Sequence, residues 1–137
     1  PGVLHLAFKA IETEDPYPVK AYLAYRHDPL MAFPDPEALK KAWRKLDLLV
    51  AVTFSWSDTA WFADVVLPVT AWAEQSGHYL NLDGRLQQAH AALPAPAGTR
   101  SNLQALQALA AQLGIDSAVD WRASLTRRPA VVSLELD

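Results

Sequence analysis

The sequence feature that most constrains the fold is "DLLVAVTF", a continuous apolar run over residues 47–54. A run of this length, rich in β-branched residues, is typical of a strand covered on both faces of a parallel sheet. An amphipathic helix is predicted directly before it, over residues 35–46, because Asp35 can cap its start and Pro36 suits its first position. A further strand is predicted from Val19 to Tyr25. Strand, helix and strand in this order predict a βαβ unit.

A third buried strand is predicted over "DVVLP", residues 64–68, with Pro68 ending it. A short helix over residues 59–62, capped by Ser57 or Asp58, leads into that strand. The apolar patterns also predict helices over residues 3–11 and 103–113, one or two helical turns over 121–127 and a final strand over 129–136.

Residues 77–87, "GHYLNLDGRLQ", alternate polar and apolar side chains around Asp83-Gly84, which favours a hairpin with a two-residue turn. With the parallel strands, this predicts an α/β, Rossmann-like three-layer domain with a mostly parallel sheet and a short β-ribbon excursion. The length of 137 residues suits one domain spanning residues 1–137. Trp43 and Trp61 fall on apolar helix positions and are expected in its core.

Composition excludes several classes of function. Because the chain has no cysteine, it carries no thiolate metal ligand or iron–sulfur cluster of its own. A net charge of -3, without basic residues interleaved with aromatic ones, argues against nucleic-acid binding. The apolar runs are far shorter than the roughly 20 residues that cross a bilayer, which argues against direct membrane insertion. The four histidines are scattered, so no metal site is expected.

Candidate binding residues follow the predicted strands, because ligands of open α/β sheets bind at the carboxyl ends of the strands. Ser55, Ser57 and Thr59 suit a phosphate or a sugar hydroxyl, although Ser57 can also simply cap a helix. His27 and Asp28 are a weaker candidate for an acid–base pair, because neighbouring loop residues usually point apart. Glu74 is either a general acid or an anchor for the backbone of the Gly77 turn.

The stretch from Lys45 to Gln88 resembles the molybdopterin oxidoreductase superfamily, which indicates a more specific function than the strand pattern does. The matching features are a strand, a Thr-Glu-Thr-Ala-like turn at "SDTA", then "ADVVLP", "WAEQSG" and a downstream asparagine with Gly-Arg. The resemblance covers about residues 15–114 and leaves 115–137 unassigned. The matching residues are most like those of the polysulfide and thiosulfate reductase branch or of formate dehydrogenases. The large iron–sulfur subunit of respiratory complex I is a further relative.

The resemblance implies an internal α/β domain that helps to hold one of two molybdopterin guanine dinucleotides. The family's cofactor contacts fall here on Asp28, Val52, Thr53 and Gln75, beside the candidates Ser57 and Thr59. Asp28 replaces a common amide, and its added negative charge calls for a partner, for which Arg26 is a candidate. No residue of this chain is expected to be catalytic or to bind the metal.

We therefore expect a partial domain of a molybdenum or tungsten bis(molybdopterin guanine dinucleotide) oxidoreductase, which forms part of the dinucleotide-binding wall and is not catalytic alone. The cofactor would be shared with the remaining domains of the parent enzyme and absent from this chain alone. Iron–sulfur and membrane-anchor subunits would be further partners. The sequence does not determine the cellular compartment of the protein. Two alternatives are a redox-inactive docking module like the complex I homologue and a stand-alone α/β domain that binds a small ligand.

Overall fold

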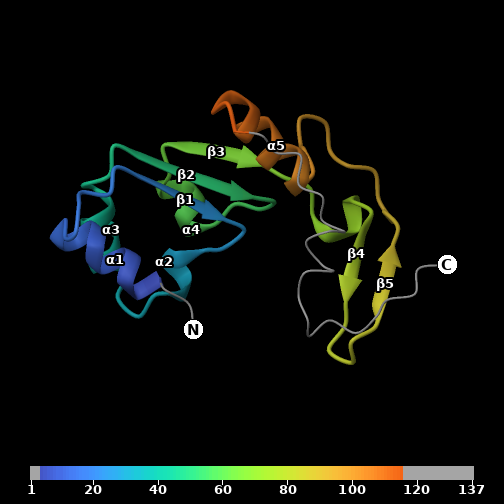
Figure 1. Ribbon diagram of the computed structural model, residues 1–137, viewed down its shortest axis with the longest axis horizontal. Helices are drawn as coiled ribbons and strands as arrows, with labels where there is room; N and C mark the ends of the chain where they lie inside the picture. The colour runs from blue at the N-terminus through green and yellow to red at the C-terminus, as the bar shows by residue number, and fades with distance from the viewer. Residues whose placement is uncertain (1–3, 116–137) are drawn as a thin grey trace. The chain divides into compact units, whose positions relative to one another are not determined.

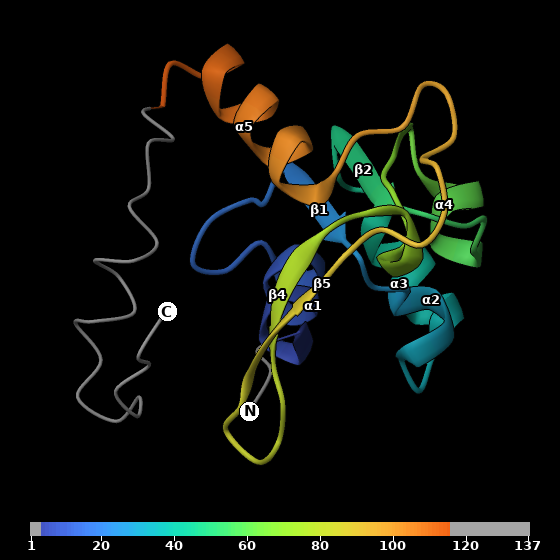
Figure 2. The ribbon, with the colours of Figure 1, turned by 90° about the vertical axis from the view of Figure 1, so that its right-hand side faces the viewer.

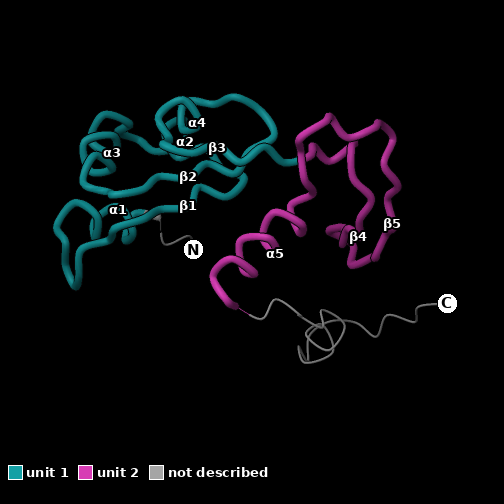
Figure 3. Tube along the Cα trace, turned by 90° about the horizontal axis from the view of Figure 1, so that it is seen from above, with its two compact units in different colours: residues 1–69 teal, residues 70–137 magenta. Residues whose placement is uncertain are grey.

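The computed structural model describes residues 4–115. The chain divides into two compact units, residues 1–69 and 70–137, which are coloured separately in Figure 3. The helical turns predicted over 121–127 and the strand predicted over 129–136 lie outside the described residues. The single domain over 1–137 stays a prediction, and each unit is described by itself.

The first unit is built on a three-stranded parallel sheet in the order β1–β2–β3 (Figure 1). The strands are β1 (Ala21–Tyr25), β2 (Leu48–Thr53) and β3 (Val65–Pro68). Tyr25 pairs with Val52, and Thr53 pairs with Pro68, so the three carboxyl ends lie at one edge. The helices are α1 (Leu4–Thr13), α2 (Pro29–Ala32), α3 (Pro36–Trp43) and α4 (Asp58–Phe62). The predicted parallel α/β arrangement is confirmed.

All four helices of this unit pack on one face of the sheet. The strand order steps in one direction from β1 to β3, and right-handed crossovers then place the connecting helices on the same face. A single hydrophobic cluster joins them to the sheet through Tyr22 and Leu49, which are register partners. The cluster takes buried or half-buried side chains from every helix: Phe8, Ile11, Leu30, Phe33, Leu39, Ala42, Trp43 and Phe62. The unit therefore has two layers, and its own helices do not form the third layer of the expected arrangement.

The other face of this sheet carries apolar side chains that remain partly exposed. Val65 is 41% exposed on β3, and Leu23 and Leu48 are exposed on β1 and β2. The prediction of a buried strand over residues 64–68 is wrong in this unit, because β3 is an edge strand and helices cover only one of its faces. The middle strand comes closest to the expectation, with Leu49, Ala51 and Val52 buried.

Local capping explains where the connecting helices begin. Asp35 accepts a hydrogen bond from the Ala38 amide at 2.9 Å, as the sequence predicts. Of the two candidate caps for α4, the structure uses Ser57, whose Oγ accepts from the Ala60 amide at 3.2 Å. Helix α2 was not predicted, although Pro29 occupies its first turn, where a missing amide hydrogen costs nothing.

Only one of the two tryptophans predicted in the core is buried. Trp43 is 3% exposed and its ring lies 5.6 Å from that of Tyr22. Trp61 is 74% exposed, so its assignment to the core is wrong. It stacks instead on the exposed ring of Trp56, with 4.7 Å between the ring centroids. Helix α4 has only five residues, and so short a helix offers no reliable apolar stripe to read from the sequence.

The second unit contains a two-stranded antiparallel ribbon, drawn as a long hairpin in Figure 2. Its elements are the 3-10 helix η1 (Trp72–Glu74), β4 (Gly77–Leu80), β5 (Leu86–Ala89) and α5 (Asn102–Gln112). The Asn81 amide donates to the Arg85 carbonyl and the Gly84 amide donates to the Asn81 carbonyl. With Gly84 at φ 82°, this is a three-residue turn with a bulge. The ribbon is confirmed, and the two-residue turn is wrong.

Candidate functional site

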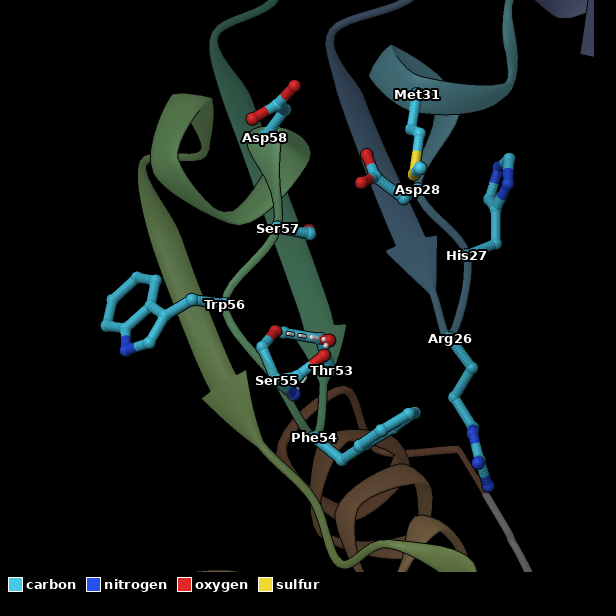
Figure 4. Close-up of a pocket in the computed structure, with 10 residues that line it drawn as sticks. All are labelled: Arg26, His27, Asp28, Met31, Thr53, Phe54, Ser55, Trp56, Ser57 and Asp58. Atoms are coloured by element: carbon cyan, nitrogen blue, oxygen red, sulfur yellow. Dashed lines mark hydrogen bonds between the residues drawn. The ribbon is translucent and has the colours of Figure 1, made fainter.

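The carboxyl edge of the parallel sheet carries an open cavity of about 500 Å³. It is formed by the loops that follow β1 and β2, together with α2 and the start of α4 (Figure 4). The lining residues are Arg26, His27, Asp28, Met31, Thr53, Phe54, Ser55, Trp56, Ser57 and Asp58. Three predicted cofactor residues, Asp28, Thr53 and Ser57, thus line one cavity. Parallel pairing brings the ends of β1 and β2 together, although their sequence positions are far apart.

Asp28 is held in place by Thr59. Its Oδ1 accepts one hydrogen bond from the Thr59 amide at 3.2 Å and another from the Thr59 hydroxyl. The same hydroxyl oxygen accepts from the Leu30 amide at 3.2 Å. Because Thr59 is 1% exposed, it acts as a support behind the Asp28 carboxylate and does not line the cavity. The carboxylate therefore has hydrogen-bond donors from Thr59, and residues 4–115 contain no ion pair between Asp28 and Arg26.

The end of β2 contributes Val52 and Thr53 in different ways. The Val52 side chain is 2% exposed, and its carbonyl accepts from the Arg26 amide at 2.8 Å. Val52 is therefore a backbone position at this edge. The Thr53 hydroxyl lines the cavity, where it donates to the Ser55 carbonyl at 2.9 Å and accepts from the Ser55 amide at 3.3 Å. These bonds fold the strand end into a tight turn at the mouth of the cavity.

Gln75 belongs to the second unit. Its Oε1 accepts from the Thr70 hydroxyl at 3.0 Å. The neighbouring Glu74 accepts from the Ala71 amide at 2.8 Å, so it anchors backbone as one sequence interpretation proposed, but at Ala71 and not in the Gly77 turn. Gln75 as a cofactor contact stays a prediction.

His27 and Asp28 do not form an acid–base pair. The side chains of His27 and Asp28 point to opposite sides (Figure 4). The Asp28 carboxylate accepts from Thr59, and the His27 Nε2 lies 3.5 Å from the Tyr22 hydroxyl. Burial raises the pKa of Tyr22 above its ordinary value of 10.0. The Tyr22 hydroxyl therefore stays protonated at neutral pH.

Sequence reasoning missed Met31 as a lining residue, and it placed Phe54 at the ligand edge after the second strand without giving it a role in binding. The Arg26 guanidinium lies over the Phe54 ring, 5.5 Å from its centroid. Met31 is 82% exposed on α2, a helix that the sequence pattern did not reveal. Arg26 itself has φ 51°, in the left-handed region that a residue with a side chain seldom adopts.

Two kinds of feature are absent from the residues that the structure describes. Between residues 4 and 115, no group of three or more histidines and acidic side chains is arranged to hold a metal ion. No helix in this part is long and apolar enough to cross a bilayer. The groups that the cavity offers to a ligand are hydroxyl, carboxylate, guanidinium, imidazole, thioether and aromatic side chains.

A sequence model described as "Molybdopterin oxidoreductase" matches residues 4–112. The chain belongs to the molybdopterin oxidoreductase family. The match includes both loops that line the cavity and the ribbon of the second unit, as the resemblance in the sequence implied.

Individual members of the molybdopterin oxidoreductase family agree with this assignment. The assimilatory nitrate reductase catalytic subunit of Bacillus subtilis is 31% identical over 79% of this chain and 15% of its own length. The thiosulfate reductase molybdopterin-containing subunit of Salmonella typhimurium is 30% identical over 93% of this chain and 17% of its own. A subunit of the NADH-quinone oxidoreductase of Rhizobium meliloti is 38% identical over 56% of this chain and 9% of its own.

A solved structure of a related protein has the same fold. Acetylene hydratase from Pelobacter acetylenicus superposes with a TM-score of 0.74 and 26% identity, over 84% of this chain and 16% of that protein. The chain thus spans about 15% of the length of the nitrate reductase subunit and a similar share of the hydratase. These relatives are much larger proteins, and the region similar to this chain is one part of each.

Proposed function

We propose that the cavity at the carboxyl edge forms part of the wall that holds the guanine dinucleotide end of a molybdopterin cofactor. The parent would be a molybdenum or tungsten oxidoreductase with two such dinucleotides. The observation that supports this most is the convergence of Asp28, Thr53 and Ser57 on one cavity, although α2, α3 and most of β2 separate Asp28 from the other two in the chain. Family membership supports a molybdenum cofactor in the parent enzymes.

The chemistry of the lining suits one end of a nucleotide. A volume of about 500 Å³ falls within the range of small-molecule sites. The hydroxyls of Ser55 and Ser57 can donate to ribose or phosphate oxygens, and Arg26 supplies a positive charge. The bound cofactor would supply the redox chemistry at its metal, while these residues would bind and orient the nucleotide.

The six proposed cofactor residues divide by role. Asp28, Thr53 and Ser57 would face the ligand, while Val52 and Thr59 would fix the backbone and the carboxylate behind them. Gln75 remains a separate proposal in the second unit. The remaining domains of the parent would complete the cofactor site, and iron–sulfur and membrane-anchor subunits are proposed as further partners.

Binding of GDP to the 15N-labelled chain, followed by NMR, tests this proposal. We expect amide shifts concentrated in residues 26–28 and 53–58 as GDP is raised to about 1 mM, because an isolated part of a site binds weakly. Thr53→Val should weaken these shifts, and ADP should reproduce them less well. Shifts confined to other regions, or a spectrum unchanged by GDP, would contradict the proposal.

A docking role is the second candidate, and the similarity to a subunit of an NADH-quinone oxidoreductase favours it. The face of the sheet opposite the helices, on which Leu23, Leu48 and Val65 are partly exposed, provides an apolar surface for such a role. Sedimentation velocity tests this alternative. Self-association that Leu23→Ser abolishes, together with a spectrum that GDP does not change, would favour docking over cofactor binding.

A further inference from the structure

The side chain of Arg26 is placed at the cavity by an unusual backbone conformation. Arg26 directly follows β1, and its amide donates to the Val52 carbonyl at 2.8 Å. Its φ of 51° lies in the left-handed region, which disfavours residues with a Cβ. A glycine or asparagine would satisfy this turn at lower steric cost. An arginine at a position that disfavours it indicates a function for its side chain, because strained residues cluster at functional sites.

The positive charge of Arg26 is not neutralised by an acidic side chain. Among residues 4–115, the ion pairs involve lysines and Arg85, and none includes Arg26. The guanidinium instead lies over the ring of Phe54, which is 54% exposed at the end of β2. This contact holds the guanidinium at the cavity while leaving its N–H donors free of carboxylate partners.

The charges around the cavity give Arg26 a specific role. Arg26 is the only lysine or arginine among the ten lining residues, which also include the carboxylates of Asp28 and Asp58. Without Arg26, the only basic side chain left among the lining residues would be that of His27, whose Nε2 lies 3.5 Å from the Tyr22 hydroxyl. The Asp28 Oδ1 accepts from the amide and the hydroxyl of Thr59, and none of the ion pairs within residues 4–115 joins Asp28 to Arg26. Planar guanidinium groups bind phosphate oxygens through two parallel hydrogen bonds.

We infer that Arg26, held against Phe54, is the residue that selects a phosphorylated nucleotide over its uncharged nucleoside at this cavity. The ligand class is a nucleoside diphosphate group, and the guanidinium contacts its phosphate oxygens. This inference rests on the proposed function, which supplies the nucleotide, and it adds the group that discriminates. The Ser55 and Ser57 hydroxyls complete the set of donors around the phosphates.

Parallel NMR titrations with GDP and guanosine test the role of Arg26. For the unmodified chain, we expect GDP to bind about tenfold or more tightly than guanosine at residues 26–28 and 53–58, since charge-assisted hydrogen bonds are stronger than neutral ones. Raising the salt concentration should reduce this preference. Arg26→Gln should remove the preference, because it weakens GDP binding more than guanosine binding. Arg26→Gly should do the same in a backbone that no longer carries the steric cost at φ 51°.

The matched control is Arg44→Gln, which removes the same charge at the end of α3, shortly before β2 begins. That position lies towards the opposite end of the strands, so the preference for GDP should persist. If Arg26→Gln and Arg26→Gly retain the full preference for GDP, the role of Arg26 is wrong while the proposed cofactor wall stands. If neither GDP nor guanosine shifts the edge residues of the unmodified chain, both proposals are wrong.

Discussion

Asp28 and Thr59 are joined by two hydrogen bonds, in which the amide and the hydroxyl of Thr59 both donate to the same carboxylate oxygen. Asp28 lies in the loop after β1 and Thr59 lies in α4, 31 positions further along the chain. Since the Thr59 oxygen also accepts from the Leu30 amide, one buried hydroxyl connects the loop after β1, the start of α2 and α4. This connection fixes the floor of the cavity.

Thr59→Val should therefore lower the free energy of unfolding by about 1–3 kcal/mol, because the nearly isosteric valine leaves the buried Leu30 amide without its acceptor. Urea denaturation measures the change. Thr13→Val is the control, since the Thr13 hydroxyl bonds only locally on the exposed end of α1. Equal effects of the two substitutions would show that the buried connection does not contribute to stability.

The tryptophans give a matched pair of substitutions. Trp43→Ala removes a buried ring that packs between Tyr22 and Phe62 and should cost about 3–5 kcal/mol of unfolding free energy. Trp61→Ala removes a ring that is 74% exposed and should cost about 1 kcal/mol or less. Urea denaturation followed by circular dichroism measures both without relying on tryptophan fluorescence. A larger loss for Trp61→Ala than for Trp43→Ala would contradict the placement of both rings.

The order of strands and helices in the first unit is the part of the fold that could be predicted. Residues 47–54 predict β2 because apolar, β-branched runs suit the middle of a parallel sheet, and β2 is the middle strand. The exposure of Val65 was not predictable in the same way. An edge strand and a central strand have similar apolar sequences, and the difference depends on which segments pack beside them.

The candidate site was predictable as an edge of the sheet and not as a set of contacts. Strand ends at residues 25 and 53 mark the edge, since parallel strands end together. The bond between Asp28 and Thr59 depends on tertiary packing across 31 residues and leaves no local pattern. The left-handed turn at Arg26 also escapes the sequence, because arginine is not a residue that predicts positive φ.

The turn of the ribbon gives a local prediction. Gly84 has φ 82°, so Gly84→Ala should strain the turn and accelerate hydrogen exchange of the Asn81 amide by about tenfold. The amide of Asn81 is the reporter because it donates to the Arg85 carbonyl across the turn. Gly77→Ala is the control, because a Cβ there meets only ordinary contacts with the Tyr79 ring, the nearest at 3.7 Å. Slow exchange in Gly84→Ala would exclude the bulged turn.

The partly buried phenol of Tyr22 predicts a dependence of stability on alkaline pH. Burial raises the pKa of Tyr22 in the folded chain, whereas in the unfolded chain the phenol titrates near its ordinary value of 10.0. As the pH rises above about 10, the unfolded state releases this proton first, so the free energy of unfolding falls. Below that pH both states keep the proton, and the contribution is constant. Tyr22→Phe removes this contribution to the dependence of stability on pH.

Urea denaturation between about pH 8 and pH 11 measures the effect, since the slope of stability against pH reports the difference in bound protons. We expect the unmodified chain to lose stability more steeply above pH 10 than Tyr22→Phe does, while other titrating groups contribute equally to both. Tyr25→Phe removes a phenol from the partly exposed opposite face of the sheet and serves as the control. Parallel profiles for the unmodified chain and Tyr22→Phe would mean that the phenol is not desolvated in the folded protein.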